Sequence, residues 1–512
     1  MPDLEAPATR RWFAFIDLTG QQWLILLMVQ LANMLYGMTI TVANLVLPQM
    51  RGTFSATQDE ISWIITLNLM AAAIVTPLTA WLAGYVGWRK MMFGTVAGFT
   101  IASALCGFAQ GLESLIFARV LQGAFGAPIA PLGQAILLAT FPRHLQPFAL
   151  VMWGVGSVFG PVIGPVVGAY VTEIWNWRAV FFMIIPPAIL TLICTWSALR
   201  GYDLVKKVRL DWIGFLALSC ALLCAQLIFD RGHKLDWFSS PTIIICTFLG
   251  ALSAWVFVAQ CLTADQPFLS PSLLMDRNFA IGTLIAFVVG MLSFTTLVLF
   301  PTLLHDLRGY PEDAISTLIS ARGLGNWTAF FFISRLTRIA PRFAIAAGFV
   351  IQAVGCFWMA SFDMNVTDFS IFWSHYLMGL GNSVVFTPMA VMAFSTLPRE
   401  QITEGSAVFT MMRNFGSSLF ISMAVLVLLR SKSISYSELA EFVTPFRELT
   451  RDADSLSNWD TSSISGLIQI SGEMSRQAAM VGYMNAFLMM AITAAVAIPL
   501  SLLLRRPPQE TD

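Results

Sequence analysis

Fourteen long apolar stretches limit what this chain can fold into more than any other feature of its sequence. Each contains about twenty mostly apolar residues, the length that an α-helix needs to cross the hydrocarbon core of a bilayer. Only 11% of the 512 residues are charged, whereas a typical soluble domain has about 25%. The sequence therefore predicts an all-α membrane protein. The expected spans are 23–47, 61–83, 91–109, 115–139, 148–171, 179–199, 211–229, 241–262, 279–304, 315–333, 343–362, 369–395, 406–429 and 480–504.

The distribution of Lys and Arg predicts the orientation, because these residues are enriched in cytoplasmic loops. If the amino terminus is cytoplasmic, sixteen of them lie on the cytoplasmic side and ten outside, and five of the ten belong to one long loop, 430–479. An even number of spans then places both termini in the cytoplasm. We expect a cytoplasmic amino-terminal segment over 1–22 and a cytoplasmic tail over 505–512.

The chain looks duplicated, with six spans before residue 200, six after residue 279 and two between. Each half has a basic turn between its second and third spans. Paired six-helix halves are typical of alternating-access transporters, whose substrate site lies between the halves. The predicted parts are an amino-terminal half over 23–200, two inserted helices with linkers over 201–278, and a carboxy-terminal half over 279–504 that contains the periplasmic loop 430–479.

The fourth span carries an arginine inside an apolar helix. An intramembrane charge costs about 2.5–3.5 kcal/mol on insertion scales and is a functional hypothesis by default. Arg119, Gln122, Gly123 and Gly126 follow i, i+3, i+4, i+7 spacing and share one helical face. We interpret this face as a hydrogen-bond network in a transport cavity. The alternative is that the Arg119 side chain snorkels out of the apolar region to the outer headgroups.

A ridge of glycines follows in the fifth span, where small residues every fourth position let another helix approach closely. Pro161 and Pro165 lie within the ridge and each favours a bend. Plain helix packing and a sliding interface both fit this pattern. We expect the ridge to face the other half of the protein and to serve conformational change. Its glycines are Gly156, Gly160, Gly164 and Gly168.

Charged and titratable residues elsewhere in the spans are candidates for transport or coupling. Arg322 and Arg413 lie inside the tenth and thirteenth spans, and a structural clamp on carbonyls is the alternative for each. No Asp or Glu lies well inside a predicted span. His375 is the titratable group deep in a span whose pKa is near working pH. It is a candidate proton relay, although a lone buried His is more often a packing residue.

Polar side chains of the first two spans are candidates for lining a substrate cavity. The 40 Phe and 25 Met suit a site for hydrophobic ligands of varied shape, although membrane burial explains much of this count. The cavity candidates are Gln30, Asn33, Thr39, Asn44 and Asn68.

Two common classes of site are not expected. The seven cysteines fall in or at the edge of apolar segments, so a disulfide framework is not expected. Cys220 and Cys224 share a helical face, but no His or carboxylate lies near them in that segment, so we expect packing and no metal site. The formal net charge is zero, which gives no basic signature for nucleic acid.

Three motifs resemble those of the major facilitator superfamily. Leu115–Gly123 resembles its span 4 motif, Gly154–Gly168 its antiporter motif in span 5, and Trp81–Lys90 its loop between spans 2 and 3. Nearly the whole chain resembles the fourteen-span drug:proton antiporter branch. Thr39 stands where this branch commonly carries an acid in span 1, and Gly84 stands where the loop motif usually has Asp.

The resemblance implies a major facilitator fold with fourteen helices arranged as 6 + 2 + 6 in a bacterial inner membrane. It implies a multidrug efflux transporter that exports hydrophobic or amphipathic compounds by alternating access and proton antiport, with the proton gradient as energy source and no cofactor. The cytoplasmic gate loop would contain Gly87, Arg89 and Lys90. The implied partners are an EmrA-like periplasmic adaptor and a TolC-like outer-membrane channel.

Two alternatives remain open. The first is a narrow-specificity exporter of a metabolite, siderophore or fatty acid, or a facilitator that no longer uses protons, and the missing acid of span 1 favours this alternative. The second is a membrane receptor or an enzyme. No convergent set of acid, nucleophile or metal ligands lies within the spans, so an enzyme is not expected.

Overall fold

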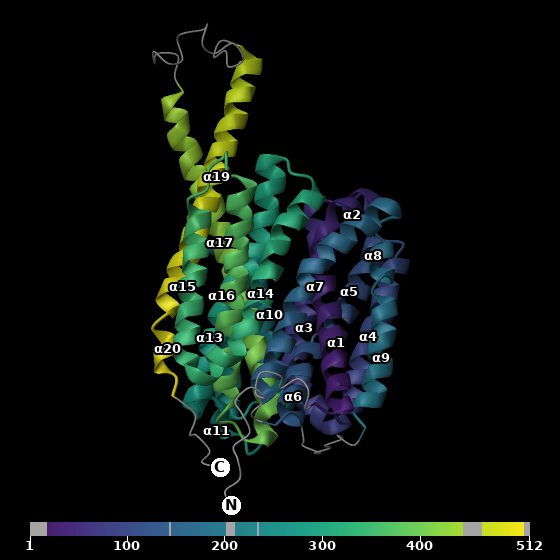
Figure 1. The fold of residues 1–512 in the computed structure, drawn as a ribbon. Coiled ribbons are helices and arrows are strands. Elements are labelled where there is room, and N and C mark those ends of the chain that lie inside the picture. Colours follow the sequence, from purple (N-terminus) through teal and green to yellow (C-terminus); the bar gives the residue numbers. More distant parts are fainter. Residues whose placement is uncertain (1–17, 143–144, 201–209, 233–234, 444–462, 506–512) are drawn as a thin grey trace, which may run out of the picture.

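Long helices packed side by side along one direction make up the computed structural model of this chain (Figure 1). The structure describes residues 18–142, 145–200, 210–232, 235–443 and 463–505, and within these ranges it contains no strand. Helix α1 crosses the bundle and leads into α2, which lies at the end opposite α20 (Figure 1). The first and last described helices therefore begin and finish at the same end of the bundle. This is the arrangement expected from an even number of spans.

The amino-terminal half runs from α1 to α9. Its helices are α1 (Gly20–Leu45), α2 (Leu47–Phe54), α3 (Gln58–Val86), α4 (Trp88–Phe108), α5 (Leu112–Gly126), α6 (Ile129–Thr140), α7 (Gln146–Ile174), α8 (Ala179–Phe182) and α9 (Ile185–Ala198). The predicted fourth span is formed by α5 and α6 together, which are separated at Ala127 and Pro128. Helix α7 continues through both of its internal prolines, Pro161 and Pro165.

The rest of the chain forms an inserted pair and a second half. The inserted segment contains α10 (Trp212–Arg231), η3 (Trp237–Ser239), α11 (Pro241–Thr263) and α12 (Pro271–Met275). The second half contains α13 (Arg277–Thr302), η4 (Leu303–Leu307), α14 (Glu312–Ile339), α15 (Pro341–Ala360), α16 (Asp368–Phe394), η5 (Arg399–Gln401), α17 (Ile402–Phe442), α19 (Ile464–Ala497) and α20 (Leu500–Leu503).

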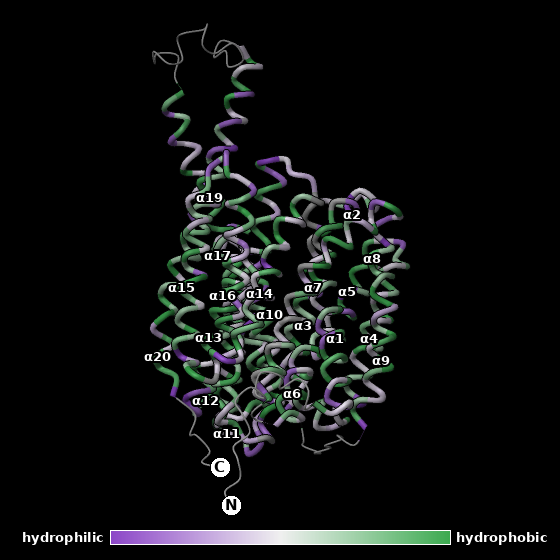
Figure 2. The backbone as a smooth tube through the Cα atoms, viewed as in Figure 1, coloured by the Kyte–Doolittle hydropathy of each residue, from purple (hydrophilic) through white to green (hydrophobic). Residues whose placement is uncertain are grey.

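Each predicted span coincides with one helix or with two consecutive helices. Within the described residues, 13 helical stretches are long and apolar enough to cross a membrane. The remaining predicted span lies in α14, which has 28 residues but carries Arg322, Arg335 and Arg338. These charges lower its mean hydropathy without shortening it. The all-α architecture of 6 + 2 + 6 helices is confirmed. Figure 2 shows the hydrophobic residues along the bundle and hydrophilic ones toward its ends.

The two halves pack their helices in the same pairs. Helix α1 packs on α7 as α13 packs on α17, and α3 packs on α5 as α14 packs on α16. The pairs α4 with α5 and α4 with α9 recur as α15 with α16 and α15 with α19. A duplicated chain is expected to repeat its contacts in this way.

The inserted pair lies against both halves through one helix. Helix α10 contacts α3 and α17, whereas α11 packs mainly on α10 and buries only Ile243 and Ser253. The start of α10 is fixed by the Asp211 carboxylate, which accepts hydrogen bonds from the backbone N–H groups of Gly214 and Phe268 at 3.0 and 3.2 Å. The linker is in turn fixed to α17, because the N–H of Ser270 donates to Glu404 at 2.5 Å.

The predicted loop 430–479, in which a short helix was a possibility, contains helix at both ends, and its middle part 444–462 lies outside the described residues. Helix α17 continues to Phe442 and α19 begins at Ile464, so both extend beyond the bundle as two projecting helices (Figure 1). The Tyr436 hydroxyl and the Ser471 hydroxyl lie 2.9 Å apart across these helices. The polar composition of the segment suggested a loop, but a helix outside the membrane needs no apolar surface on the side that faces water.

Candidate functional site

A pocket lies between the two halves of the molecule. Helix α7 contributes one wall, and α13, α14, α16 and α17 contribute the others. The space not filled by protein atoms is about 810 Å³, including the part open to solvent. The lining residues are Trp153, Gly154, Ser157, Pro161, Val289, Ser293, Phe294, Leu297, Arg322, Asn326, Phe330, Ile333, Asn382, Ser383, Phe386, Thr387 and Arg413.

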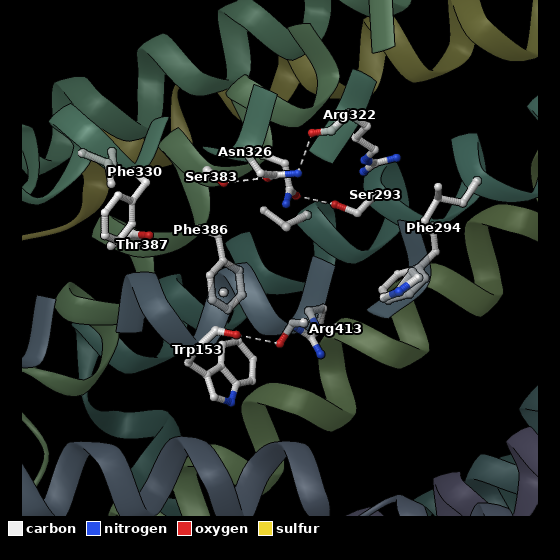
Figure 3. A pocket seen from close by; sticks show the side chains of 17 residues that line it. Trp153, Ser293, Phe294, Arg322, Asn326, Phe330, Ser383, Phe386, Thr387 and Arg413 are labelled. Atoms are coloured by element: carbon white, nitrogen blue, oxygen red, sulfur yellow. Dashed lines mark hydrogen bonds between the residues drawn. The ribbon is translucent and has the colours of Figure 1, made fainter. Parts of the chain in front are cut away.

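The polar side of the pocket contains two amides that are already hydrogen-bonded within the protein (Figure 3). Asn326 donates to the backbone carbonyl of Arg322 at 2.8 Å and accepts from the Ser383 hydroxyl at 2.6 Å. Ser293 donates to the Asn382 side-chain oxygen at 2.5 Å. These bonds orient the amides and use much of their hydrogen-bonding capacity.

The two arginines of the pocket keep unpaired donors. Arg322 is 1% exposed, and its Nη1 has no hydrogen-bond partner. The Nε of Arg413 is buried and has no partner either. Within the part of the chain that the structure describes, neither arginine forms an ion pair, and the pocket lining contains no Asp or Glu. Two cationic groups therefore face this pocket without a protein anion.

Aromatic rings from both halves meet at the pocket. Trp153 of α7 stacks on Phe386 of α16 with ring centroids 5.3 Å apart and an interplanar angle of 17°. The indole N–H of Trp153 donates to the Ala130 carbonyl at 3.3 Å, which fixes the ring. The Arg413 guanidinium carbon lies 5.5 Å from the Trp153 ring centroid and 5.8 Å from that of Phe386. At these distances a cation is attracted to both ring faces.

Arg119 lies in a separate buried network inside the amino-terminal half. Its side chain is 1% exposed, and its Nη1 donates to the Gln122 side-chain oxygen at 2.5 Å. Gln122 donates in turn to the Ser103 hydroxyl of α4 at 2.7 Å. Asn68 of α3 donates to the Arg119 carbonyl at 2.7 Å. The protein encloses this side chain, which argues against the headgroup alternative, but Arg119 does not line the pocket.

None of the predicted cavity residues whose side chains the structure describes lines the pocket. The Thr39 hydroxyl donates to the Leu35 carbonyl of its own helix, and Asn68 is engaged by Arg119. Asn33 is buried with an unpaired side-chain nitrogen, and Gln30 contacts the glycine ridge of α7. The side chain of Asn44 lies outside the described residues. Polarity alone did not indicate that α1 lies away from this pocket.

The glycine ridge of α7 packs on α1, within the same half, so the prediction that it faces the other half was wrong. A Cβ at Gly164 would lie 2.9 Å from the Thr41 hydroxyl, and one at Gly168 would lie 3.1 Å from Val42. A Cβ at Gly160 would collide with the Met34 carbonyl. Gly156 and Pro161 are equally close to α1, opposite Gln30 and Gly37. Other residues of α7 contact the second half.

Gly123 and Gly126 likewise serve close helix packing. A Cβ at Gly123 would collide with the Asn68 carbonyl of α3, and one at Gly126 would lie 2.7 Å from the Tyr36 ring of α1. The shared face of α5 thus places Arg119 and Gln122 among three neighbouring helices. Whether the helices slide on these contacts stays a prediction.

His375 is buried away from the pocket in the second half. Its Nδ1 lies 3.1 Å from the Ile371 carbonyl, and its ring centroid lies 4.1 Å from that of Phe300. These contacts are those of a packed and hydrogen-bonded side chain. No carboxylate is within hydrogen-bonding distance of it in the described structure, and its role in proton relay stays a prediction.

The turn between α3 and α4 depends on Gly87, whose φ of 90° is open to glycine and disfavoured for other residues. Arg89 follows it and donates to the Trp196 carbonyl of α9 at 2.9 Å, with its guanidinium 4.0 Å from the Trp196 ring centroid. Lys90 is exposed. In this structure Arg89 therefore contacts its own half, and the gate role of the loop stays a prediction.

The residues that sequence reasoning missed are those that complete the pocket around the two arginines. Trp153 and Phe386 belong to spans rich in apolar residues, where an aromatic ring carries no signal of its own. Asn326 gave a usable signal, because it follows Arg322 by four residues and shares its helical face.

Comparisons with known proteins place this architecture among characterised sequences. A family model described as "Major Facilitator Superfamily" matches residues 29–421. The "Multidrug export protein EmrB" of Escherichia coli strain K12 is 30% identical over 433 residues, which cover 84% of this chain and 85% of that protein. The "Fatty acid resistance protein FarB" of Neisseria gonorrhoeae is 29% identical over 473 residues, covering 91% of this chain and 93% of that protein.

Solved structures match the fold over almost the whole chain. The human organic anion transporter MFSD10 superimposes with a TM-score of 0.58 at 12% identity, covering 96% of this chain and 100% of that one. At this level of identity the match supports the fold alone.

Proposed function

Because this chain belongs to the major facilitator superfamily, we propose that it is a multidrug efflux transporter that exports hydrophobic or amphipathic compounds across a bacterial inner membrane by alternating access. The resemblance read from the span 4 and span 5 motifs is confirmed, and the relatives are EmrB-like export proteins. The family points to transport and not to catalysis, which leaves the receptor and enzyme alternatives without support.

The observation that carries the proposal is the pocket between the halves. Its lining combines α7 of the first half with four helices of the second, and it places aromatic rings beside polar groups. Ligand sites in duplicated transporters lie at such an interface near the membrane midplane. A largely apolar pocket with a few convergent polar groups is also the common form of a small-molecule site.

We infer that export is coupled to proton antiport, with the proton gradient as the energy source. A membrane potential of about 100 mV contributes roughly 2.3 kcal/mol per charge moved, so one or two protons would drive a useful gradient. The residues available for coupling are the Arg119 network, His375 and carboxylates at the edges of the membrane. Asp230 is one of these carboxylates, since it lies at the end of α10. It accepts a hydrogen bond from buried Thr66 at 2.7 Å.

We further propose that the protein is the pump of a tripartite system with an EmrA-like periplasmic adaptor and a TolC-like outer-membrane channel. The projecting parts of α17 and α19 support this, since they offer a surface outside the bundle (Figure 1). Apolar side chains exposed on them include Ile434, Phe442, Ile464, Leu467 and Ile468. Of these, Ile464, Leu467 and Ile468 are three and four residues apart and share one helical face, which would suit a protein contact.

An efflux assay in a strain without its own drug pumps tests the proposal. Cells that express this chain should survive higher concentrations of several unrelated hydrophobic compounds than cells with the empty vector. A protonophore should abolish the efflux of a fluorescent substrate from loaded cells. Export that continues at full rate after the proton gradient collapses would contradict antiport but leave export standing.

One observation favours a second candidate, a narrow-specificity exporter that is not proton-coupled. The buried residues of the described chain include no Asp or Glu, and the pocket lining has none. Protection against a single chemical class in the same panel, with efflux unaffected by the protonophore, would identify this candidate.

A further inference from the structure

The charge of the pocket narrows the ligands that it can hold. Both pocket arginines carry a positive charge at any working pH, because the guanidinium group is not deprotonated in proteins. Arg322 is almost fully buried, with Nη1 unpaired, and Arg413 has a buried, unpaired Nε. A buried charge is costly unless it is paired. No side chain of the pocket lining supplies that pair.

The neighbouring polar groups do not replace the missing anion. The Asn326 and Asn382 oxygens accept from Ser383 and Ser293, and the Asn326 amide nitrogen is used by the Arg322 carbonyl. Neither amide oxygen hydrogen-bonds a guanidinium group. The free hydrogen-bonding capacity at this side of the pocket is therefore mainly that of donors, which suits an acceptor-rich anionic group.

The rest of the lining suits an apolar body. Trp153 and Phe386 stack beside Arg413, and Phe294 and Phe330 lie on other walls (Figure 3). A ligand cation placed on these rings would compete with Arg413 for the same ring faces and would meet its positive charge. The pocket thus combines aromatic walls with two unpaired guanidinium groups.

We propose that this pocket selects amphipathic anions, with a carboxylate or sulfonate at Arg413, an aromatic or aliphatic body against the neighbouring Trp153 and Phe386, and the charge of Arg322 adding to the positive potential of the pocket. The inference rests on the proposed function and deepens it, since it names the charge class of the exported compounds. A guanidinium group binds such oxyanions through paired N–H donors, which a lysine does not reproduce.

The test measures binding of two fluorescent probes that share one ring system. The anion is 1-anilinonaphthalene-8-sulfonate, and the neutral probe is N-phenyl-1-naphthylamine, which lacks only the sulfonate. The full chain is placed in nanodiscs of neutral lipid, and the signal of empty nanodiscs is subtracted. The sulfonate should bind saturably and about tenfold more tightly than the neutral probe, because a hydrogen-bonded charge contributes that much or more.

Variants of the two arginines separate charge recognition from packing. Arg322→Gln and Arg413→Gln should each weaken sulfonate binding by about tenfold and leave the neutral probe within about twofold of wild type. Arg322→Lys should restore part of the loss. Arg476→Gln is the matched control, because Arg476 is 50% exposed and pairs with Glu473 away from the pocket. Equal binding of the two probes, or a double variant that binds the sulfonate as wild type does, would overturn the inference.

Competition on the wild-type protein covers the case in which a variant does not fold. Octanesulfonate should displace the bound sulfonate probe, and octyltrimethylammonium should not. Displacement by both to the same extent would overturn the inference. In cells, resistance to neutral and cationic compounds without resistance to anionic ones would leave export standing and overturn anion selection. Anion-selective binding without any transport would support the pocket assignment and overturn export.

Discussion

Arg119 shows how a single intramembrane charge can be held without a carboxylate. Its guanidinium group donates to Gln122, which donates to Ser103, so one chain of hydrogen bonds joins α5 to α4. The Nε of Arg119 keeps no partner. Such a network tolerates little change, because each member orients the next.

We predict that Arg119→Ala abolishes export while the protein still reaches the membrane. The substitution removes the charge and leaves Gln122 without its donor, which costs about 1–3 kcal/mol for a buried polar group. The measurement is drug resistance beside the amount of protein in isolated membranes. Arg476→Ala is the control, and normal export by Arg119→Ala would contradict a transport role for Arg119.

We also predict that Gly160→Ala destabilises the protein. A Cβ there would collide with the Met34 carbonyl of α1, so α1 and α7 would have to separate. Overpacking of this kind costs about 1–3 kcal/mol, which should lower the thermal unfolding midpoint in detergent. Gly94→Ala is the matched control, since a Cβ at Gly94 meets nothing within 4 Å. Equal midpoints for the two variants would show that the α1–α7 contact can relax.

At the residue scale, the sequence identified the charged members of the site and missed the apolar ones. Arg322 and Arg413 were found because a charge in a span is rare and costly. Trp153 and Phe386 could not be found, because a ring in an apolar helix faces lipid, core or cavity with the same local pattern. The prediction of which part of the protein the α7 ridge faces was wrong for a related reason. The spacing of the glycines defines a helical face but does not identify the helix that packs on it.

At the element scale, helix length and membrane thickness are separate quantities. Helix α17 has 41 residues and α19 has 34, whereas about twenty residues cross a bilayer. The sequence predicted where each apolar segment lies, and the structure shows that the helices continue past it. Contacts between the two extensions, such as the one between the Tyr436 and Ser471 hydroxyls, are not visible in a hydropathy profile.

We predict that the projecting helices are needed for resistance in cells but not for transport in vesicles. Four exposed apolar residues would be replaced by Ser in one variant: Ile434, Phe442, Leu467 and Ile468. Loss of an adaptor contact should return drug sensitivity to about that of the empty vector, since a few apolar anchors supply most of the binding energy of an interface. Uptake into inverted membrane vesicles from the same cells should be unchanged. Full resistance in cells would contradict adaptor contact at this surface.

At the scale of the whole molecule, the order of packed helix pairs repeats between the halves, which the count of spans before and after the insertion anticipated. The position of the pocket was anticipated only as lying between the halves. Its lining comes from one helix of the first half and four of the second. No local pattern in the sequence encodes how the two halves pack against each other.

We predict that a covalent link between the halves stops transport. Phe159 of α7 and Trp327 of α14 have ring centroids 6.1 Å apart, and neither lines the pocket. With both replaced by Cys, in a background without the native cysteines, a short bifunctional methanethiosulfonate, which forms a disulfide with each thiol, should lower the export rate by about tenfold or more, because alternation requires the halves to move. A reducing agent should restore the rate. The two single-Cys variants are controls, and an unaffected linked protein would contradict alternating access.

Helix α10 joins the two halves, because it contacts α3 of the first half and α17 of the second. Its first end is held to the linker by Asp211, and the linker is held to α17 through Glu404 and Ser270. Its far end is held to α3 of the other half, where Asp230 accepts from Thr66 at 2.7 Å. Alternating access, as proposed above, would therefore require one of these contacts to break in each cycle. The Asp230 side chain is 38% exposed, so water can replace its hydrogen bond with Thr66, and we expect this bond to be the one that breaks.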